Sequence, residues 1–199
     1  MMPIKIQMDL PKTVWLVAFL NLAYFGVEFT VARAIGSVSL FADSVDFLED
    51  AAINLLIGLT LMASMIVRAR VGRCLAILIL IPGLATLWTA WNQFQAPSPP
   101  QPTLLSVTAA GALAVNLTCA FLLTRFRASR GSLTRAAFLS ARNDALANVA
   151  IIAAGLVTAF LWQTAWPDLI VGLAIAALNA DAARDVWKAA GREGTVLQA

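Results

Sequence analysis

The chain has 199 residues, of which 60% are hydrophobic and only 13% are charged, and its mean hydropathy is +0.81. A soluble domain of this length cannot cover so much apolar surface, so the composition indicates a membrane protein. The sequence has no histidine, which excludes Ser-His-Asp and Cys-His catalysis and most zinc-enzyme sites. Its two cysteines, Cys74 and Cys119, lie far apart in apolar runs, which argues against both a zinc finger and a disulfide.

Apolar runs separated by charged or turn-forming residues predict six membrane-spanning helices. In chain order they cover residues 14–34, 39–66, 74–94, 104–124, 135–161 and 168–186. The breaks coincide with the Gly-Ser pair at 36–37, the proline-rich stretch 97–102 and the Trp-Pro pair at 166–167. Six spans of roughly 20 residues take up most of the chain. We therefore expect an all-α integral membrane protein, with a single transmembrane domain over residues 1–199 and no soluble domain.

Basic residues outside these spans gather on one side of the membrane in the predicted topology. They are Lys5, Lys12, Arg68, Arg70, Arg73, Arg125, Arg127, Arg130, Lys188 and Arg192. The opposite side holds little positive charge beyond Arg33, so the positive-inside rule places both termini in the cytoplasm. Topology thus accounts for the net charge of +3, and no nucleic-acid partner is expected. A compact multi-pass chain of this kind suits a bacterial inner membrane.

The second predicted span carries four acidic residues, Asp43, Asp46, Glu49 and Asp50, inside an otherwise apolar run. An acid at a helix centre costs about 2.5 to 3.5 kcal/mol on insertion, whereas each Leu, Ile, Phe or Val returns only about 0.3 to 0.6 kcal/mol. This helix therefore needs polar neighbours. Asp46, Asp50 and Asn54 are four residues apart and form one polar stripe, while Glu49 lies about a quarter turn away from it.

The fifth predicted span repeats this spacing with Ser140, Asp144 and Asn148. Oxygen donors on facing stripes of two helices near the bilayer midplane are what a divalent cation needs there. We expect Asp46, Asp50 and Asp144, called here the aspartate triad, to bind the metal ion, with Ser140 and Asn148 as weaker contributors. Crowded, poorly solvated carboxylates hold protons when empty and release them to a bound cation, which provides the linkage for proton exchange.

Five segments of the chain share the pattern of one transporter family. They are residues 21–28 (NLAYFGVE), 36–43 (GSVSLFAD), the pair Asp46-x-x-x-Asp50, residues 133–144 with the pair Ser140-x-x-x-Asp144, and residues 166–176. On these residues the chain resembles the cation diffusion facilitator family of divalent-metal transporters. The resemblance implies a transporter and not an enzyme, which exports a divalent metal ion from the cytoplasm by proton antiport across the lipid bilayer. It implies no organic cofactor.

The sequence departs from the family pattern in two ways. Ser140 stands where the family usually has a fifth-helix histidine, so only the triad remains of four expected strong ligands. An all-oxygen set favours harder ions such as manganese or ferrous iron, with Asn148, Asn54 or water completing the shell, and leaves zinc and cobalt open. The family's cytoplasmic metal-sensing domain is also expected to be absent, because only about a dozen residues follow the last predicted span.

Other residues and roles stay open. Arg142 lies two residues from Asp144 and is an alternative charge partner for the triad, although residues two apart on a helix point about 200° away from each other. Glu28, through the resemblance, and Asp43, as a nearby acid that guides entry or supports its helix, are secondary site candidates. Small residues such as Gly172 suit close helix packing and a homodimer contact.

A second hypothesis is a non-transporting regulatory membrane subunit that pairs with a full-length transporter. The missing histidine, Arg142 and the short tail motivate it. An intramembrane hydrolase is less well supported, because no nucleophile–base pair is visible.

Overall fold

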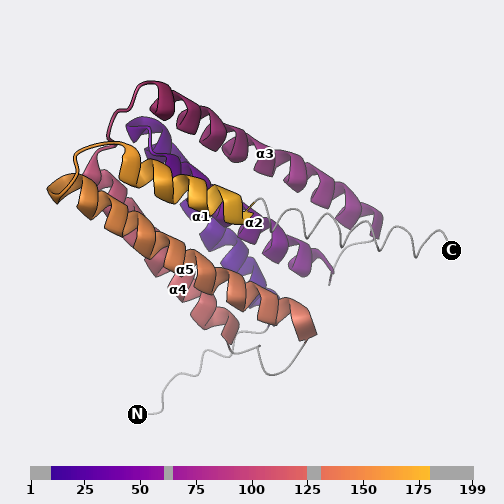
Figure 1. The fold of residues 1–199 in the computed structure, drawn as a ribbon. Coiled ribbons are helices and arrows are strands. Elements are labelled where there is room, and N and C mark those ends of the chain that lie inside the picture. The colour runs from indigo at the N-terminus through magenta and orange to yellow at the C-terminus, as the bar shows by residue number, and fades with distance from the viewer. Residues whose placement is uncertain (1–9, 61–64, 125–130, 180–199) are drawn as a thin grey trace, which may run out of the picture.

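The computed structural model is an all-helical bundle, and it describes residues 10–60, 65–124 and 131–179 (Figure 1). Six helices lie within these ranges. In chain order they are α1 (Leu10–Ile35), α2 (Val38–Thr60), α3 (Met65–Gln95), α4 (Pro102–Thr124), α5 (Gly131–Phe160) and a sixth helix (Trp166–Asn179).

All six predicted helices are present, but two boundaries differ from the prediction. α2 ends at Thr60 instead of at 66, and α3 begins at Met65 instead of at 74. Arg68, Arg70 and Arg73, which were predicted to lie outside the spans, therefore belong to the first turns of α3. Arginine is a good helix former, so the end of an apolar run does not end the helix.

Three described helical stretches are long and apolar enough to cross a membrane by length and composition. They are Leu10–Ile35, Pro102–Thr124 and Asn143–Phe160. α2 has the length of a span but carries the four acidic residues predicted from the sequence. It therefore depends on its neighbours in the bundle to shield those groups.

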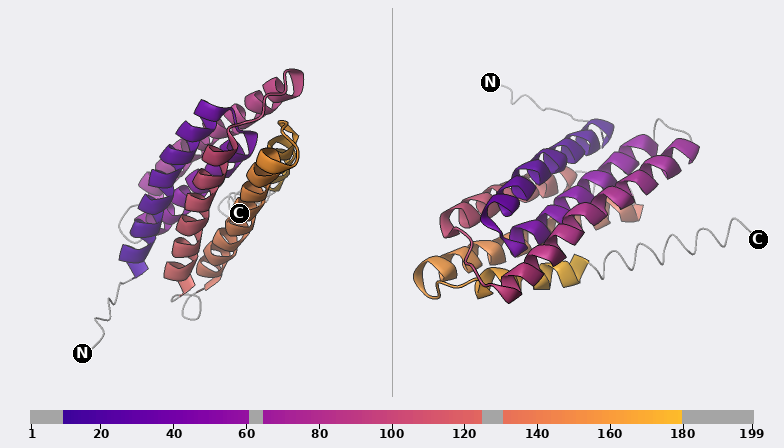
Figure 2. Two further views of the ribbon diagram at one scale, coloured as in Figure 1. Left: turned by 90° about the vertical axis from the view of Figure 1, so that its left-hand side faces the viewer. Right: turned by 90° about the horizontal axis from the view of Figure 1, so that it is seen from above.

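α2 is the central element of the packing. It contacts α1, α3 and α5, while α4 packs against α1 and α5. The further views in Figure 2 agree that α4 and α5 run side by side. The turns at 36–37, 96–101 and 161–165 lie together at one end of the bundle, called here the turn end (Figure 1).

The largest hydrophobic cluster joins α1, α2, α4, α5 and the sixth helix. Its buried members are Ala32, Leu40, Phe41, Ala42, Leu105, Ala109, Ile151 and Ile175. Large apolar side chains also cover the outside of α3, where Leu80, Leu84 and Trp88 are each at least 60% exposed. Such an apolar exterior suits contact with lipid and not with water.

A tight turn connects α1 to α2. Gly36 has a φ of +68°, in the left-handed region that residues with a side chain rarely adopt. The N–H of Ser37 donates to the carbonyl of Ala32 at 3.1 Å and so completes the C-terminus of α1. The Ser37 hydroxyl accepts from the N–H of Leu40 at 3.2 Å, so Ser37 is the N-cap of α2.

Asp168 of the sixth helix adds a second cap to the same end of α2. Its Oδ1 accepts from the hydroxyl of Ser37 at 2.7 Å, and from the hydroxyl and N–H of Ser39 at 2.5 and 3.3 Å. Its Oδ2 accepts from the N–H of Val38 at 2.7 Å. Both carboxylate oxygens of this buried residue therefore have partners, and a residue near the C-terminus fixes the start of α2.

Gly172 allows the sixth helix to come this close. A Cβ atom at position 172 would lie 2.7 Å from the backbone nitrogen of Ser39 and 2.7 Å from the carbonyl carbon of Val38. Real Cβ atoms do not approach backbone atoms so closely, so any side chain here would push the sixth helix away from α2.

Candidate metal centre

The aspartate triad lies in the contact between α2 and α5. Asp50 is buried, and Asp46 and Asp144 are half-buried. The carboxylate of Asp144 is close enough to those of Asp46 and Asp50 to interact with each electrostatically. The i, i+4 spacing on α2 and the packing of α5 against it thus bring the three predicted ligands to one level of the bundle.

The triad does not close into a coordination shell. In the part of the chain that the structure describes, no three Asp, Glu or Cys side chains come together at distances that could hold a metal ion. Ser140 and Arg142 belong to α5, but their side chains lie outside the described part of the structure. The contribution of Ser140 and the role of Arg142 stay predictions.

Asn54 and Asn148 extend the polar stripes of α2 and α5. The amide of Asn54 is buried and donates to the carbonyl of Asp50 at 2.9 Å. The amide of Asn148 donates to the carbonyl of Asp144 at 2.8 Å and reaches Oδ1 of Asp43 at 3.5 Å. The side chain of Asn148 therefore lies beside Asp43, a residue that the sequence analysis ranked as secondary.

Glu28 is the third member of this second group. It comes from the middle of α1 and has no exposed surface, and neither of its carboxylate oxygens has a hydrogen-bond partner. Its carboxyl group lies within hydrogen-bonding range of that of Asp43. We call Glu28, Asp43 and Asn148 the Glu28 cluster. The sequence signal for it was an acid inside a long apolar run, which is costly unless it has a function.

Polar residues that the sequence analysis missed surround these acids. Tyr24 donates its hydroxyl to the carbonyl of Thr108 at 2.7 Å and packs against Phe47, with ring centroids 5.2 Å apart. The thiol of Cys119 is buried on α4 and lies 3.8 Å from Oδ1 of Asn21. Single polar residues in apolar helices give no sequence signal of which neighbour they will meet.

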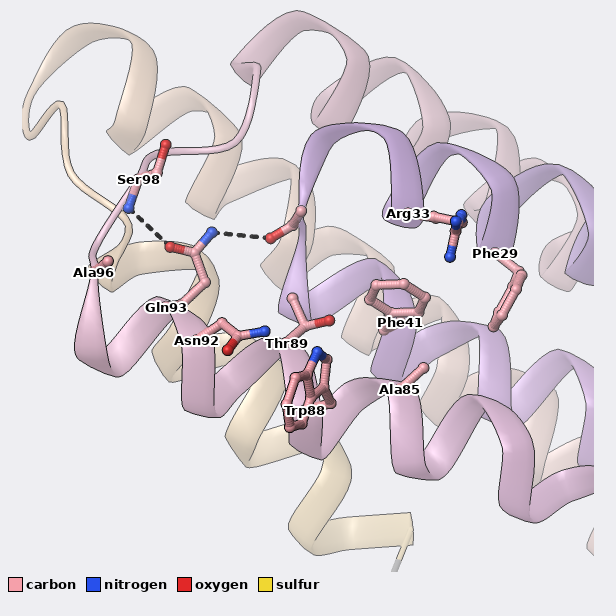
Figure 3. A pocket seen from close by; sticks show the side chains of 11 residues that line it. Phe29, Arg33, Phe41, Ala85, Trp88, Thr89, Asn92, Gln93, Ala96 and Ser98 are labelled. Atoms are coloured by element: carbon pink, nitrogen blue, oxygen red, sulfur yellow. Dashed lines mark hydrogen bonds between the residues drawn. The ribbon is translucent and has the colours of Figure 1, made fainter.

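A separate cavity of about 540 Å³ lies at the turn end between α1, α2 and α3 (Figure 3). It is lined by Phe29, Arg33, Gly36, Phe41, Ala85, Trp88, Thr89, Asn92, Gln93, Ala96 and Ser98. The amide of Gln93 crosses it, donating to the carbonyl of Gly36 at 3.0 Å and accepting from the N–H of Ser98 at 2.8 Å. The lining contains a cation and no acid, so this cavity is not the candidate metal centre.

The family model of the cation efflux transmembrane domain matches residues 71–193, which is more than half of the chain. The chain belongs to the cation diffusion facilitator family. The matched segment covers most of α3 and all of α4, α5 and the sixth helix, and it includes Asp144 and Asn148. α1 and α2, with Glu28 and the acids of α2, precede it. No curated protein matches the chain.

Membership of the cation diffusion facilitator family defines the general activity. The chain is a multi-pass membrane protein and a cation transporter, and not an enzyme. A divalent metal ion is the substrate class of this family. The buried acids of α1, α2 and α5 lie in the interior of the transmembrane bundle, where a cation would have to pass.

Proposed function

We propose that this member of the cation diffusion facilitator family is a six-span exporter that binds a divalent metal ion at the aspartate triad and exchanges it for protons. The observation that carries the proposal is the meeting of carboxylates from α2 and α5 inside the bundle. In the part of the chain whose side chains are described, the basic residues are Lys12 and Arg33, and both are exposed. Carboxylates crowded within a bilayer need a cation or protons to balance them.

The chemistry of the donors favours a hard cation. Carboxylate and amide oxygens are the ligands preferred by Mn²⁺ and Fe²⁺, and the weak fit to Zn²⁺ follows from the absence of histidine. The open arrangement of the triad is consistent with alternating access, in which a rotation of α2 against α5 closes the site around the ion. The proposed topology places both termini in the cytoplasm of a cell, and so places the turn end on the other side of the membrane.

Flux through reconstituted protein tests this proposal. The purified chain in liposomes, with a metal-sensitive dye inside and an imposed proton gradient, should accumulate Mn²⁺ or Fe²⁺, with Zn²⁺ and Co²⁺ as comparisons. Asp144→Asn should reduce flux by about 100-fold or more, because it removes a charged ligand without changing the shape of the residue. Glu49→Gln, the same chemical change on α2 but off the polar stripe, is the matched control. Unchanged flux in both Asp144→Asn and Asp50→Asn would overturn the proposal.

The alternative is a regulatory subunit that binds a longer relative and transports nothing itself. Ser140 in place of histidine favours it, because the triad alone offers fewer strong ligands than the family pattern. Co-purification with such a relative, together with no metal bound by the isolated chain, would support this alternative.

A further inference from the structure

Buried oxygen atoms without partners gather at one place in the bundle. They are Oε1 and Oε2 of Glu28, Oδ2 of Asp43 and Oδ1 of Asn148. All three residues have a relative exposure of 0%. Buried polar atoms in proteins almost always have a hydrogen-bond partner, so four unpaired acceptors in one cluster require an explanation.

The geometry places these oxygens around a common point. Glu28 reaches it from α1, Asp43 from α2 and Asn148 from α5. Asn148 lies 3.5 Å from Asp43, and the carboxyl group of Glu28 is in hydrogen-bonding range of the same aspartate. Three different helices thus aim oxygen donors at each other with no apolar residue needed to separate them.

From this we infer that the Glu28 cluster is a second cation site, which binds the transported divalent metal ion after it leaves the aspartate triad. This inference rests on the proposed function and adds a step to it. Two carboxylates balance the charge of a divalent ion, and the amide oxygen adds a neutral ligand of the kind that hard cations accept.

A cation explains the four atoms better than a proton or a water molecule does. One shared proton between Glu28 and Asp43 satisfies a single pair of oxygens and leaves two acceptors unpaired. A water molecule has only two hydrogens to donate and leaves both negative charges uncompensated. A metal ion contacts all the oxygens at once and neutralises both carboxylates.

The position of the cluster suggests its role in transport. On α2, Asp43 lies three residues nearer the turn end than Asp46, and on α5, Asn148 lies four residues nearer than Asp144. At 1.5 Å per residue, the cluster is displaced by about 4.5 to 6 Å along both helices. An ion moving from the triad toward the turn end therefore meets the cluster next, and two adjacent sites of moderate strength favour release over trapping.

Counting bound Mn²⁺ on the purified full chain tests the second site. Free Mn²⁺ gives a sharp electron paramagnetic resonance signal that bound Mn²⁺ does not, so titration gives the number of ions per chain. We expect the wild type and the Glu49→Gln control to bind two ions, Glu28→Gln and Asp144→Asn to bind one each, and the double variant to bind none. Asn148→Ala, which only removes atoms, should weaken the same ion as Glu28→Gln and serves if that variant does not fold.

The outcomes separate this inference from the proposed function. If Asp144→Asn loses an ion while Glu28→Gln and Asn148→Ala bind Mn²⁺ as the wild type does, the second site is refuted and the triad stands. If the folded wild type binds no Mn²⁺ at all, both are refuted. Loss of one ion in Glu28→Gln, with the triad ion retained, supports the second site.

Discussion

The two ends of a short stretch of α2 hold carboxylates that are equally buried and very differently bonded. Asp168, at the N-terminus of α2, is 1% exposed and accepts four hydrogen bonds through both of its oxygens. Glu28, beside Asp43 about one turn further along, is 0% exposed and has no hydrogen-bond partner for either oxygen. Burial alone therefore does not separate a structural acid from a functional one, whereas the number of satisfied oxygens does.

The difference has an energetic meaning. A fully bonded buried carboxylate contributes to stability, because its removal leaves several donors without an acceptor. An unpaired buried carboxylate costs stability, and a protein retains it when a ligand compensates the charge during function. Substitutions at the two places should therefore change folding stability in opposite directions.

The largest effect on stability is expected at the satisfied end. Asp168→Ala removes the acceptor for the hydroxyls and backbone N–H groups at the start of α2, and should destabilise the bundle by about 3 to 6 kcal/mol. Asp168→Asn keeps one acceptor oxygen and should lose about half as much. Thermal unfolding in detergent measures both. A melting temperature for Asp168→Ala equal to that of the wild type would break the comparison, because the bonded acid would then contribute nothing.

An intermediate effect is expected where the sixth helix touches α2. Gly172→Ala places a Cβ atom 2.7 Å from backbone atoms of Val38 and Ser39, and should cost about 1 to 3 kcal/mol through displacement of the helices. Gly83→Ala is the matched control, because nothing lies within 4 Å of a Cβ there. It should be neutral or stabilising by up to about 1 kcal/mol. Equal melting temperatures for the two variants would contradict the close contact.

The smallest effect on stability, with the opposite sign, is expected at Glu28. Glu28→Gln removes a buried charge that has no hydrogen-bond partner, and should leave stability unchanged or raise it by about 1 kcal/mol in the absence of metal. Adding Mn²⁺ should then stabilise the variant less than the wild type, because the variant binds one ion fewer. Thermal unfolding with and without Mn²⁺ checks both statements. Destabilisation as large as that of Asp168→Ala would place Glu28 with the structural acids.

Much of the helical framework could be predicted from the sequence, because apolar runs of about 20 residues with breakers between them leave few alternatives. The start of α3 could not, since its arginines end the apolar run but continue the helix. The cap by Asp168 could not either, because it joins residues 130 positions apart. Helix rotation and packing decide such contacts, and hydropathy carries no record of them.

The candidate site was predicted in part for the same reason. The i, i+4 spacing on α2 and α5 identified the triad as a set of facing acids, and the two helices do meet. That spacing could not show that Asn148 points to Asp43, or that Glu28 of α1 joins them. Those contacts depend on which side of α1 faces α2, and a weakly amphipathic apolar helix does not encode its rotation.

The most direct test of the account compares flux in variants of the two kinds of acid. Mn²⁺ uptake into proteoliposomes under a proton gradient should be lost in Asp144→Asn, and largely retained, per folded molecule, in Asp168→Asn. That result would assign transport to the crowded carboxylates between α2 and α5. Uptake that survives in Asp144→Asn and disappears in Asp168→Asn would contradict the central claim.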